Sequence, residues 1–367
     1  IGLLVILYAR YYLSDNDHMG RFYAYLILFM TAMLGVVLSN NLLQLWFFWE
    51  LTSISSFLLI SFWSHKTDAR KGARMALTIT GAGGLALLGA LILIGQTVGS
   101  YDLRTVLASG DVLRESAVYP VIIVLFLLGA FTKSAQFPFH FWLPHAMAAP
   151  TPVSAYLHSA TMVKAGVFLL ARFYPVLADT DLWFVIVSMV GLATLLLGAY
   201  TALFKHDLKG LLAYSTISHL GLITLLFGLD TELAAIAAVF HIINHAVFKA
   251  SLFMAAGIID HESGSRDMRQ LNGLWKYMPY TATLAMVAAA SMARQGPQTP
   301  ACVENWGVFE ADPRPRWAGA SAAGRRAPAR AVGSLRVVRG HGNRGGIYTP
   351  RQERRHPLAA LPAGGEA

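Results

Sequence analysis

Apolar stretches long enough to cross a bilayer recur along the chain as far as residue 293. A helix needs about 20 apolar residues to span the hydrocarbon core. The stretches lie at about 1–13, 22–38, 42–63, 75–97, 117–139, 152–174, 182–204, 210–229, 233–259 and 279–293. Polar residues interrupt several of them, as expected where the helices of a bundle face one another. The pattern predicts an all-α, polytopic membrane helix bundle.

Composition agrees with this interpretation. The chain is 55% hydrophobic and 13% charged, and its mean hydropathy is +0.51. Its one cysteine, Cys302, excludes a disulfide framework. The sequence begins at Ile1 inside an apolar stretch and shows no signal peptide. We therefore expect residues 1–21 to be a truncated N-terminal helix and its loop.

Charge divides the chain into two parts. Residues 1–293 carry 17 Lys and Arg against 15 Asp and Glu, whereas residues 294–367 carry 12 Arg, no Lys and 5 acids. Most of the formal charge of +9 therefore belongs to the tail. The basic composition of the whole chain consequently says little about the membrane part.

The loops predict an orientation. If the spans alternate strictly, one side receives ten cationic residues, namely Arg21, Lys66, Arg70, Lys71, Arg74, Lys205, Lys209, Arg266, Arg269 and Lys276. The other side receives three, namely Arg104, Arg114 and Arg172. Because loops rich in Lys and Arg stay in the cytoplasm, the first side is predicted to be cytoplasmic.

The segment 294–367 is rich in Arg, Gly, Pro and Ala and has no apolar run. Such a composition predicts disorder. An arginine-rich arm for anionic lipid or nucleic acid and an inert extension are two interpretations. We favour a third, an out-of-frame translation beginning near codon 293, because these residues have GC-rich codons and the change falls inside an apolar stretch. An unbroken frame in independent sequencing reads would contradict it.

Ionisable residues lie inside the apolar stretches. Glu50 is in the middle of one, where a charge costs roughly 3 kcal/mol on insertion scales and is seldom kept without a role. Lys133 lies near a helix end, before Pro138 and Pro144, which are expected to break the helix and to expose backbone groups at membrane depth. A lysine that snorkels to the interface is the alternative for Lys133.

Two further lysines and three histidines share this setting. Lys164 is predicted in mid-helix, and His158, six residues earlier, is either linked to it through water or a packing residue. His241, His245 and Lys249 step by four and share one helix face. Histidine exchanges protons near neutral pH, so the spacing indicates a proton or cation route. A metal pair and a polar stripe between helices are the alternatives.

Signatures of soluble enzymes are missing from the sequence. There is no Walker loop, no Cys-x-x-Cys and no nucleophile elbow. The glycines of 81–84 have no preceding strand, so they indicate a close helix contact and not a phosphate cradle. We therefore expect no cofactor, no catalytic residue, no bound metal and no enzymatic activity.

Several motifs in one order resemble the antiporter-like family shared by respiratory complex I and the Mrp-type multisubunit Na+/H+ antiporters. They lie at 48–53, 133–138, 147–158, 212–218 and 245–250. The residues of 260–269, and the absence of an aspartate from 81–84, make the chain most similar to the large A-type subunit of the Mrp antiporters. The similarity extends over about 1–293, so both ends are expected to be incomplete.

The resemblance implies two inverted repeats of five helices, each with a broken helix. The first would occupy 22–175, and the second, incomplete repeat 176–293. It also implies that Glu50 and Lys133 form a pair that gates protonation, with Lys164 as a connecting lysine and Lys249 as a central lysine of the second repeat. His158, His241 and His245 would lie on a hydrated axis.

The leading hypothesis is a subunit of a monovalent cation (Na+ or K+)/proton antiporter in a bacterial plasma membrane. Its partners would be the other antiporter subunits and membrane lipid, with no nucleic acid. The first alternative is a proton-translocating membrane subunit of an NADH:quinone oxidoreductase. The second is a scaffold whose buried charges serve only to pair helices.

Overall fold

The structure is a computed structural model that describes residues 1–14 and 16–295. Within these residues it is all-α and has no strand, only two isolated β-bridges. The longer helices are α1 (Gly2–Tyr12), α2 (Met19–Leu38), α3 (Leu42–Ile60), α4 (Thr67–Val98), α7 (Tyr119–Lys133), α10 (Lys164–Leu177), α11 (Asp181–Leu203), α12 (Leu208–Gly228), α13 (Glu232–Ser263) and α15 (Pro279–Gln295). Our predictions for the tail concern residues outside the described part, apart from the end of α15.

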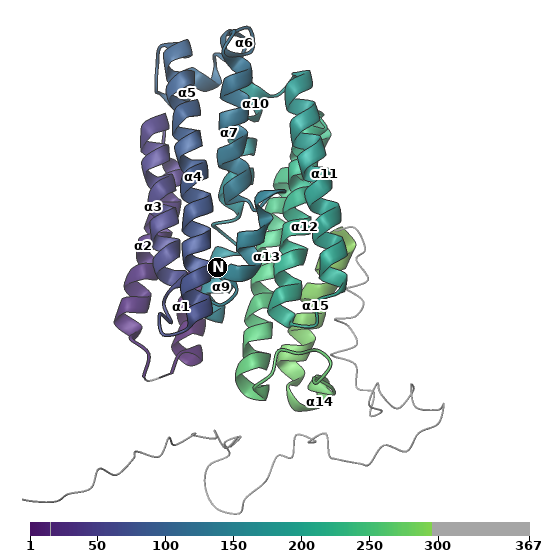
Figure 1. Cartoon of the computed structure of the whole chain (residues 1–367). Helices are drawn as coiled ribbons and strands as arrows, with labels where there is room; N and C mark the ends of the chain where they lie inside the picture. Colours follow the sequence, from purple (N-terminus) through teal and green to yellow (C-terminus); the bar gives the residue numbers. More distant parts are fainter. Residues whose placement is uncertain (15, 296–367) are drawn as a thin grey trace, which may run out of the picture. The chain divides into compact units, whose positions relative to one another are not determined.

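Short helices connect the long ones. They are α5 (Leu103–Leu107), α6 (Gly110–Arg114), the 3₁₀ turn η1 (Phe139–Phe141), α8 (Trp142–Ala146), α9 (Thr151–Leu157) and α14 (Leu274–Tyr277). Figure 1 shows α5 and α6 at one end of the bundle and α14 at the opposite end, with the long helices running between them. All of the described residues fall in one compact unit.

The membrane prediction is confirmed. In the described part of the chain, α2, α3, α4, α11, α12 and α13 are each long and apolar enough to cross a bilayer. Large apolar side chains such as Leu196 and Ile243 lie on the outer surfaces of these helices, 60% exposed. A surface of this kind is stable in lipid and not in water.

Local sequence signals define several helix ends. The Asn41 side chain accepts hydrogen bonds from the backbone N–H groups of Leu43 and Gln44 at the start of α3. The two longest helices, α4 and α13, both end at a glycine with positive φ, Gly99 at 78° and Gly264 at 68°. Only glycine takes this left-handed conformation without strain, so the chain turns back there.

Two predicted spans are interrupted. The span expected at 117–139 ends as a helix at Lys133, before the prolines, as their positions predicted. The span expected at 152–174 is divided into α9 and α10, with residues 158–163 outside both helices. The prediction that Lys164 lies in mid-helix is therefore wrong: it is the first residue of α10.

The loops predicted to share a side do come together. Backbone hydrogen bonds join the α11–α12 loop to the α13–α14 loop, from Met268 N to His206 O and from Leu208 N to Arg266 O. At the other end of the bundle, Asp230 accepts hydrogen bonds from the Tyr174 hydroxyl and the Asp179 N–H. Which end faces the cytoplasm stays a prediction.

Candidate functional site

Lys133 ends α7 with its side chain fully buried against α3. Its Nζ donates to Ser53 Oγ at 2.7 Å and to the Trp49 carbonyl at 3.1 Å, and it lies 5.0 Å from the centre of the Trp49 ring. Because Lys133 is 0% exposed, it does not snorkel to the membrane surface. The snorkelling alternative for this residue is wrong.

Glu50 lies on α3 close enough to Lys133 for electrostatic interaction. Among the described residues, however, no ion pair joins the two side chains within 4.0 Å. Glu50 Oε1 is buried and has no hydrogen-bond partner. Glu50 and Lys133 are therefore neighbours without a direct ion pair, and their role as a gating pair stays a prediction.

A serine joins the end of α7 to the start of α10. Ser134 follows Lys133, and its Oγ donates to the Val163 carbonyl at 2.7 Å and accepts from the Val167 N–H at 3.0 Å. Val163 immediately precedes Lys164. The residue after Lys133 thus contacts the residue before Lys164. The two buried lysines therefore lie at ends of α7 and α10 that are joined through Ser134.

Lys164 contacts the second half of the bundle directly. Its Nζ shares a hydrogen bond of 2.8 Å with His245 Nδ1 on α13, and it also donates to the Ser159 carbonyl. The Lys164 and His245 residues are 81 positions apart in the chain. The sequence predicted both as candidates but not their contact, because the two residues are 81 positions apart and belong to different helices.

His241 and His245 share one face of α13, as predicted, and contact a third histidine, on α12, that was not among the predicted site residues. His219 Nδ1 lies 3.0 Å from His241 Nε2, and its ring centre lies 5.2 Å from that of His245. Phe248 packs against all three rings. A histidine inside the apolar run of 210–229 was the signal that could have identified it.

Lys249 lies one helical turn beyond His245 and is fully buried. Its Nζ donates to Ser215 Oγ, which is one turn before His219 on α12. Ser215 and His219 of α12 thus face all three predicted polar residues of α13. The predicted stripe lies between α12 and α13 in full.

His158 is fully buried, but the structure does not place it in hydrogen-bond contact with Lys164. Neither of its ring nitrogens has a hydrogen-bond partner, and its ring centre lies 6.2 Å from that of Trp142. Its electrostatic neighbour is Lys209 on α12. Buried polar atoms are rarely left unpaired, so His158 is not an ordinary packing residue of the core.

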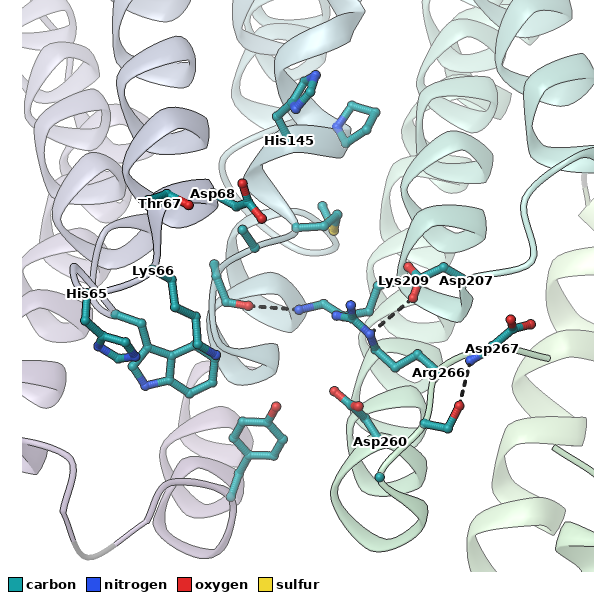
Figure 2. A pocket seen from close by; sticks show the side chains of 18 of the residues that line it. His65, Lys66, Thr67, Asp68, His145, Asp207, Lys209, Asp260, Arg266 and Asp267 are labelled. Carbon is teal, nitrogen blue, oxygen red and sulfur yellow. Dashed lines mark hydrogen bonds and ion pairs between the residues drawn. The ribbon is translucent and has the colours of Figure 1, made fainter. Parts of the chain in front are cut away.

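A polar cavity of about 1150 Å³ lies beside Lys209 (Figure 2). Its lining includes side chains of both signs, among them Lys66, Asp68, Asp260 and Arg266. Lys209, predicted from the sequence as a loop residue, is only 2% exposed, and its Nζ donates to the Ala149 carbonyl at 2.8 Å. The cavity opens at the end of the bundle where the cationic loops gather.

Ion pairs hold the loops around this cavity. Arg266 Nε lies 3.1 Å from Asp207 Oδ1, and Arg269 donates to both carboxylate oxygens of Asp267. The hydrogen bonds from Arg269 lower the pKa of Asp267 to about 2. Asp267 is therefore ionised throughout the physiological range.

A metal site is not supported in the part of the chain that the structure describes, where no group of His, Cys, Asp or Glu is arranged to hold an ion. His241 Nε2 is directed at another histidine ring and not at a shared ligand position.

Comparison with known proteins agrees with the motifs. A family model described as NADH:quinone oxidoreductase/Mrp antiporter, TM matches residues 39–312. The chain is 71% identical over 293 residues to the A/B subunit of a probable K+/H+ antiporter of Rhizobium meliloti, covering 80% of this chain and 29% of that protein. It is 52% identical over 308 residues to the A-type subunit of the Na+/H+ antiporter of Alkalihalophilus pseudofirmus, covering 80% and 38%.

Among solved structures, the Mrp complex from Dietzia sp. DQ12-45-1b matches with a TM-score of 0.74 and 38% identity, over 84% of this chain and 37% of that chain. The chain thus spans about a third of the length of these relatives. Together with the six apolar helices, the bacterial relatives identify a multi-pass plasma-membrane protein. Because the family model covers most of the sequence, the resemblance is confirmed, and the chain belongs to the NADH:quinone oxidoreductase/Mrp antiporter transmembrane family.

Proposed function

We propose that the chain is part of an A-type subunit of a multisubunit monovalent cation/proton antiporter. It would carry protons along a route formed by Glu50, Lys133, Lys164, His158, His241, His245 and Lys249. The observation that carries the proposal is the hydrogen bond between Lys164 and His245, because it joins the two halves of the bundle at full burial.

Proton transfer at this contact can be written atom by atom. The Lys164 ammonium gives a proton from Nζ to His245 Nδ1, and the ring then gives the proton on Nε2, which has no protein partner, to a water molecule. A neutral imidazole carries one proton and can exchange it for another in this way. His219 and His241 lie next to that ring and extend the route along α12 and α13.

We also propose that Lys209 and His158 link the polar cavity to this route. Lys209 lines the cavity, and His158 is its buried electrostatic neighbour. The unpaired ring nitrogens of His158 are suited to hydrogen-bond water, which would complete a path for protons between the cavity and Lys164. This assignment gives His158 the water-linked role that the sequence left open.

Helix lengths support the two proposed repeats, 22–175 and 176–293. The helices α2, α3, α4 and α7 have 20, 19, 32 and 15 residues, and α11, α12, α13 and α15 have 23, 21, 32 and 17. The helix α2 starts at the end of the bundle where α11 finishes, so the two series run in opposite directions (Figure 1). Two series of this kind are typical of inverted-repeat transporters.

The names of the relatives give two cations to test, K+ and Na+. The proposed route carries protons and does not by itself select between them. Everted membrane vesicles that contain the complete gene product with its partner subunits would report exchange as recovery of a pH-sensitive dye after either salt is added. Recovery with K+, Na+ or both supports the antiporter; no recovery with an assembled complex contradicts it.

Glu50→Gln tests the route, with His261→Gln as a matched control because His261 is exposed near the end of α13. We expect Glu50→Gln to lower exchange per assembled complex by at least about tenfold, since the proton carrier is lost. The scaffold hypothesis instead predicts a lower yield of complex with unchanged exchange per complex. Both hypotheses describe a protein that needs neither a cofactor nor enzymatic turnover.

The alternative is a proton-translocating subunit of a quinone oxidoreductase, because the family model covers both kinds of assembly. Neighbouring genes separate them. Genes for small antiporter subunits support the proposal, whereas genes for iron–sulfur and quinone-binding subunits support the alternative and would make the chain part of an enzyme complex.

A further inference from the structure

Gly84 lies on α4 where the carboxylate of Glu50 reaches it from α3. A Cβ atom at Gly84 would overlap Glu50 Oε1 and would lie 2.7 Å from Glu50 Cδ. Real Cβ atoms essentially never have neighbours closer than 3.0 Å. The carboxylate of Glu50 thus occupies the space that any side chain at position 84 would need.

The helix contact around this space is fixed by a hydrogen bond. Trp46, one turn before Glu50 on α3, donates from Nε1 to the Gly84 carbonyl at 2.9 Å. Since α3 and α4 are joined at this residue, a larger side chain cannot be accommodated by sliding one helix along the other. The Glu50 side chain would have to move instead.

Gly83, the residue before Gly84, allows α7 to approach α4 equally closely. A Cβ atom at Gly83 would overlap Thr132 Oγ1 and would lie 2.7 Å from Thr132 Cβ. Thr132 directly precedes Lys133. The adjacent glycines Gly83 and Gly84 therefore let α4 contact two neighbours, Glu50 on α3 and the turn of α7 that carries Lys133.

We infer that Gly84 is a positioning residue that gives the Glu50 carboxyl group a resting place against α4, where it is apart from Lys133 and can hold a proton. Two observations agree with this assignment. Glu50 Oε1 makes no hydrogen bond in that place, and Lys133 donates to Trp49 and Ser53 and not to Glu50. A carboxylate expelled from this space can be stabilised by pairing with the lysine.

The meaning of this resting place for transport depends on the proposed function, but its existence can be measured without transport. Carbodiimides react with protonated carboxyl groups in apolar surroundings and poorly with carboxylates paired to a lysine. Labelling of Glu50 by dicyclohexylcarbodiimide, quantified by mass spectrometry of membranes containing the full chain and its partners, therefore reports where the carboxyl group lies.

We expect Gly84→Ala to reduce the rate of Glu50 labelling about tenfold, as pairing with Lys133 replaces the resting place. The matched control is Gly81→Ala, one turn away on the same helix, where a Cβ atom meets nothing within 4 Å. Gly81→Ala should label as the unaltered chain does. Equal rates in all three proteins, or equal reductions in both variants, would overturn the inference.

The substitution Glu50→Asp distinguishes a clash between Glu50 and the new Cβ at position 84 from a general loss of stability. Glu50→Asp withdraws the carboxylate by one methylene, so adding Gly84→Ala to it should leave labelling of the shortened acid unchanged. If Gly84→Ala prevents assembly, the same double variant should restore the yield of complex, because the overlap involves the carboxylate and not the backbone. A double variant as impaired as Gly84→Ala alone would contradict the assignment.

Transport is measured separately from carbodiimide labelling. We expect Gly84→Ala to slow cation/proton exchange and Gly81→Ala to leave it unchanged, because a permanently closed Glu50–Lys133 pair cannot cycle. An unaltered complex that labels as described but exchanges neither K+ nor Na+ would remove the proposed function and leave the role of Gly84 in place.

Discussion

At the scale of single residues, the hydrogen bonds of Lys133 and Lys164 go to oxygen and nitrogen atoms that do not belong to carboxylates. Lys133 uses Ser53 and the Trp49 carbonyl, and Lys164 uses His245. A buried amine with a permanent counter-ion would be fixed in its charged form. Partners that are neutral leave the amine able to bind or release a proton, which is what a relay requires.

Ser53 gives a test at this scale. Ser53→Ala removes the 2.7 Å hydrogen bond to Lys133 Nζ, and hydrogen bonds to charged groups contribute roughly 2 kcal/mol. Because Lys133 must then find another partner, we expect exchange per complex to fall about tenfold in a vesicle assay. Ser55→Ala is the control, since the Ser55 hydroxyl donates only within its own helix, to the Leu51 carbonyl at 2.6 Å. Equal effects of the two variants would show that Ser53 has no special role.

At the scale of elements, the interruption between α9 and α10 is the feature that the sequence did not reveal. Residues 158–163 contain no proline or glycine and continue an apolar stretch, so nothing local predicts that the helix stops. Two side chains compensate for the lost helical hydrogen bonds: Ser134 donates to the Val163 carbonyl from the end of α7, and Lys164 donates locally to the Ser159 carbonyl. The break after Lys133, by contrast, follows from Pro138, which is in the sequence.

Gly166 sets how closely α10 approaches α7 beside this interruption. A Cβ atom there would overlap the Ala130 carbonyl oxygen and Ser134 Oγ. We expect Gly166→Ala to destabilise the protein by about 1–3 kcal/mol, since backbone atoms cannot move aside. Gly89→Ala is the control, because its nearest neighbour would be Leu125 Cδ1 at an ordinary 3.4 Å. Thermal unfolding of the purified complex in detergent measures the difference, and equal unfolding temperatures would contradict it.

At the scale of the whole molecule, hydropathy predicted the bundle, and the spacing of His241, His245 and Lys249 predicted one buried face. Those signals are local and periodic. The burial of Lys209 depends on which helices are neighbours, and a single sequence does not give that information. For His219, the position inside an apolar run is a local signal, and only its histidine partners depend on how the helices pack. The asymmetry of loop charge is also a whole-chain signal, and it makes a prediction about orientation.

The orientation can be tested with two exposed residues at opposite ends of the bundle, Lys66 beside the polar cavity and Arg104 on α5. Because ten cationic residues are predicted on one side and three on the other, the side of Lys66 should be cytoplasmic. With Cys302→Ser as background, Arg104→Cys should react with a membrane-impermeant maleimide in intact spheroplasts. Lys66→Cys should react only in everted vesicles. The opposite labelling would reverse the orientation and would place the polar cavity on the outer face, where it would receive ions from the periplasm instead of the cytoplasm.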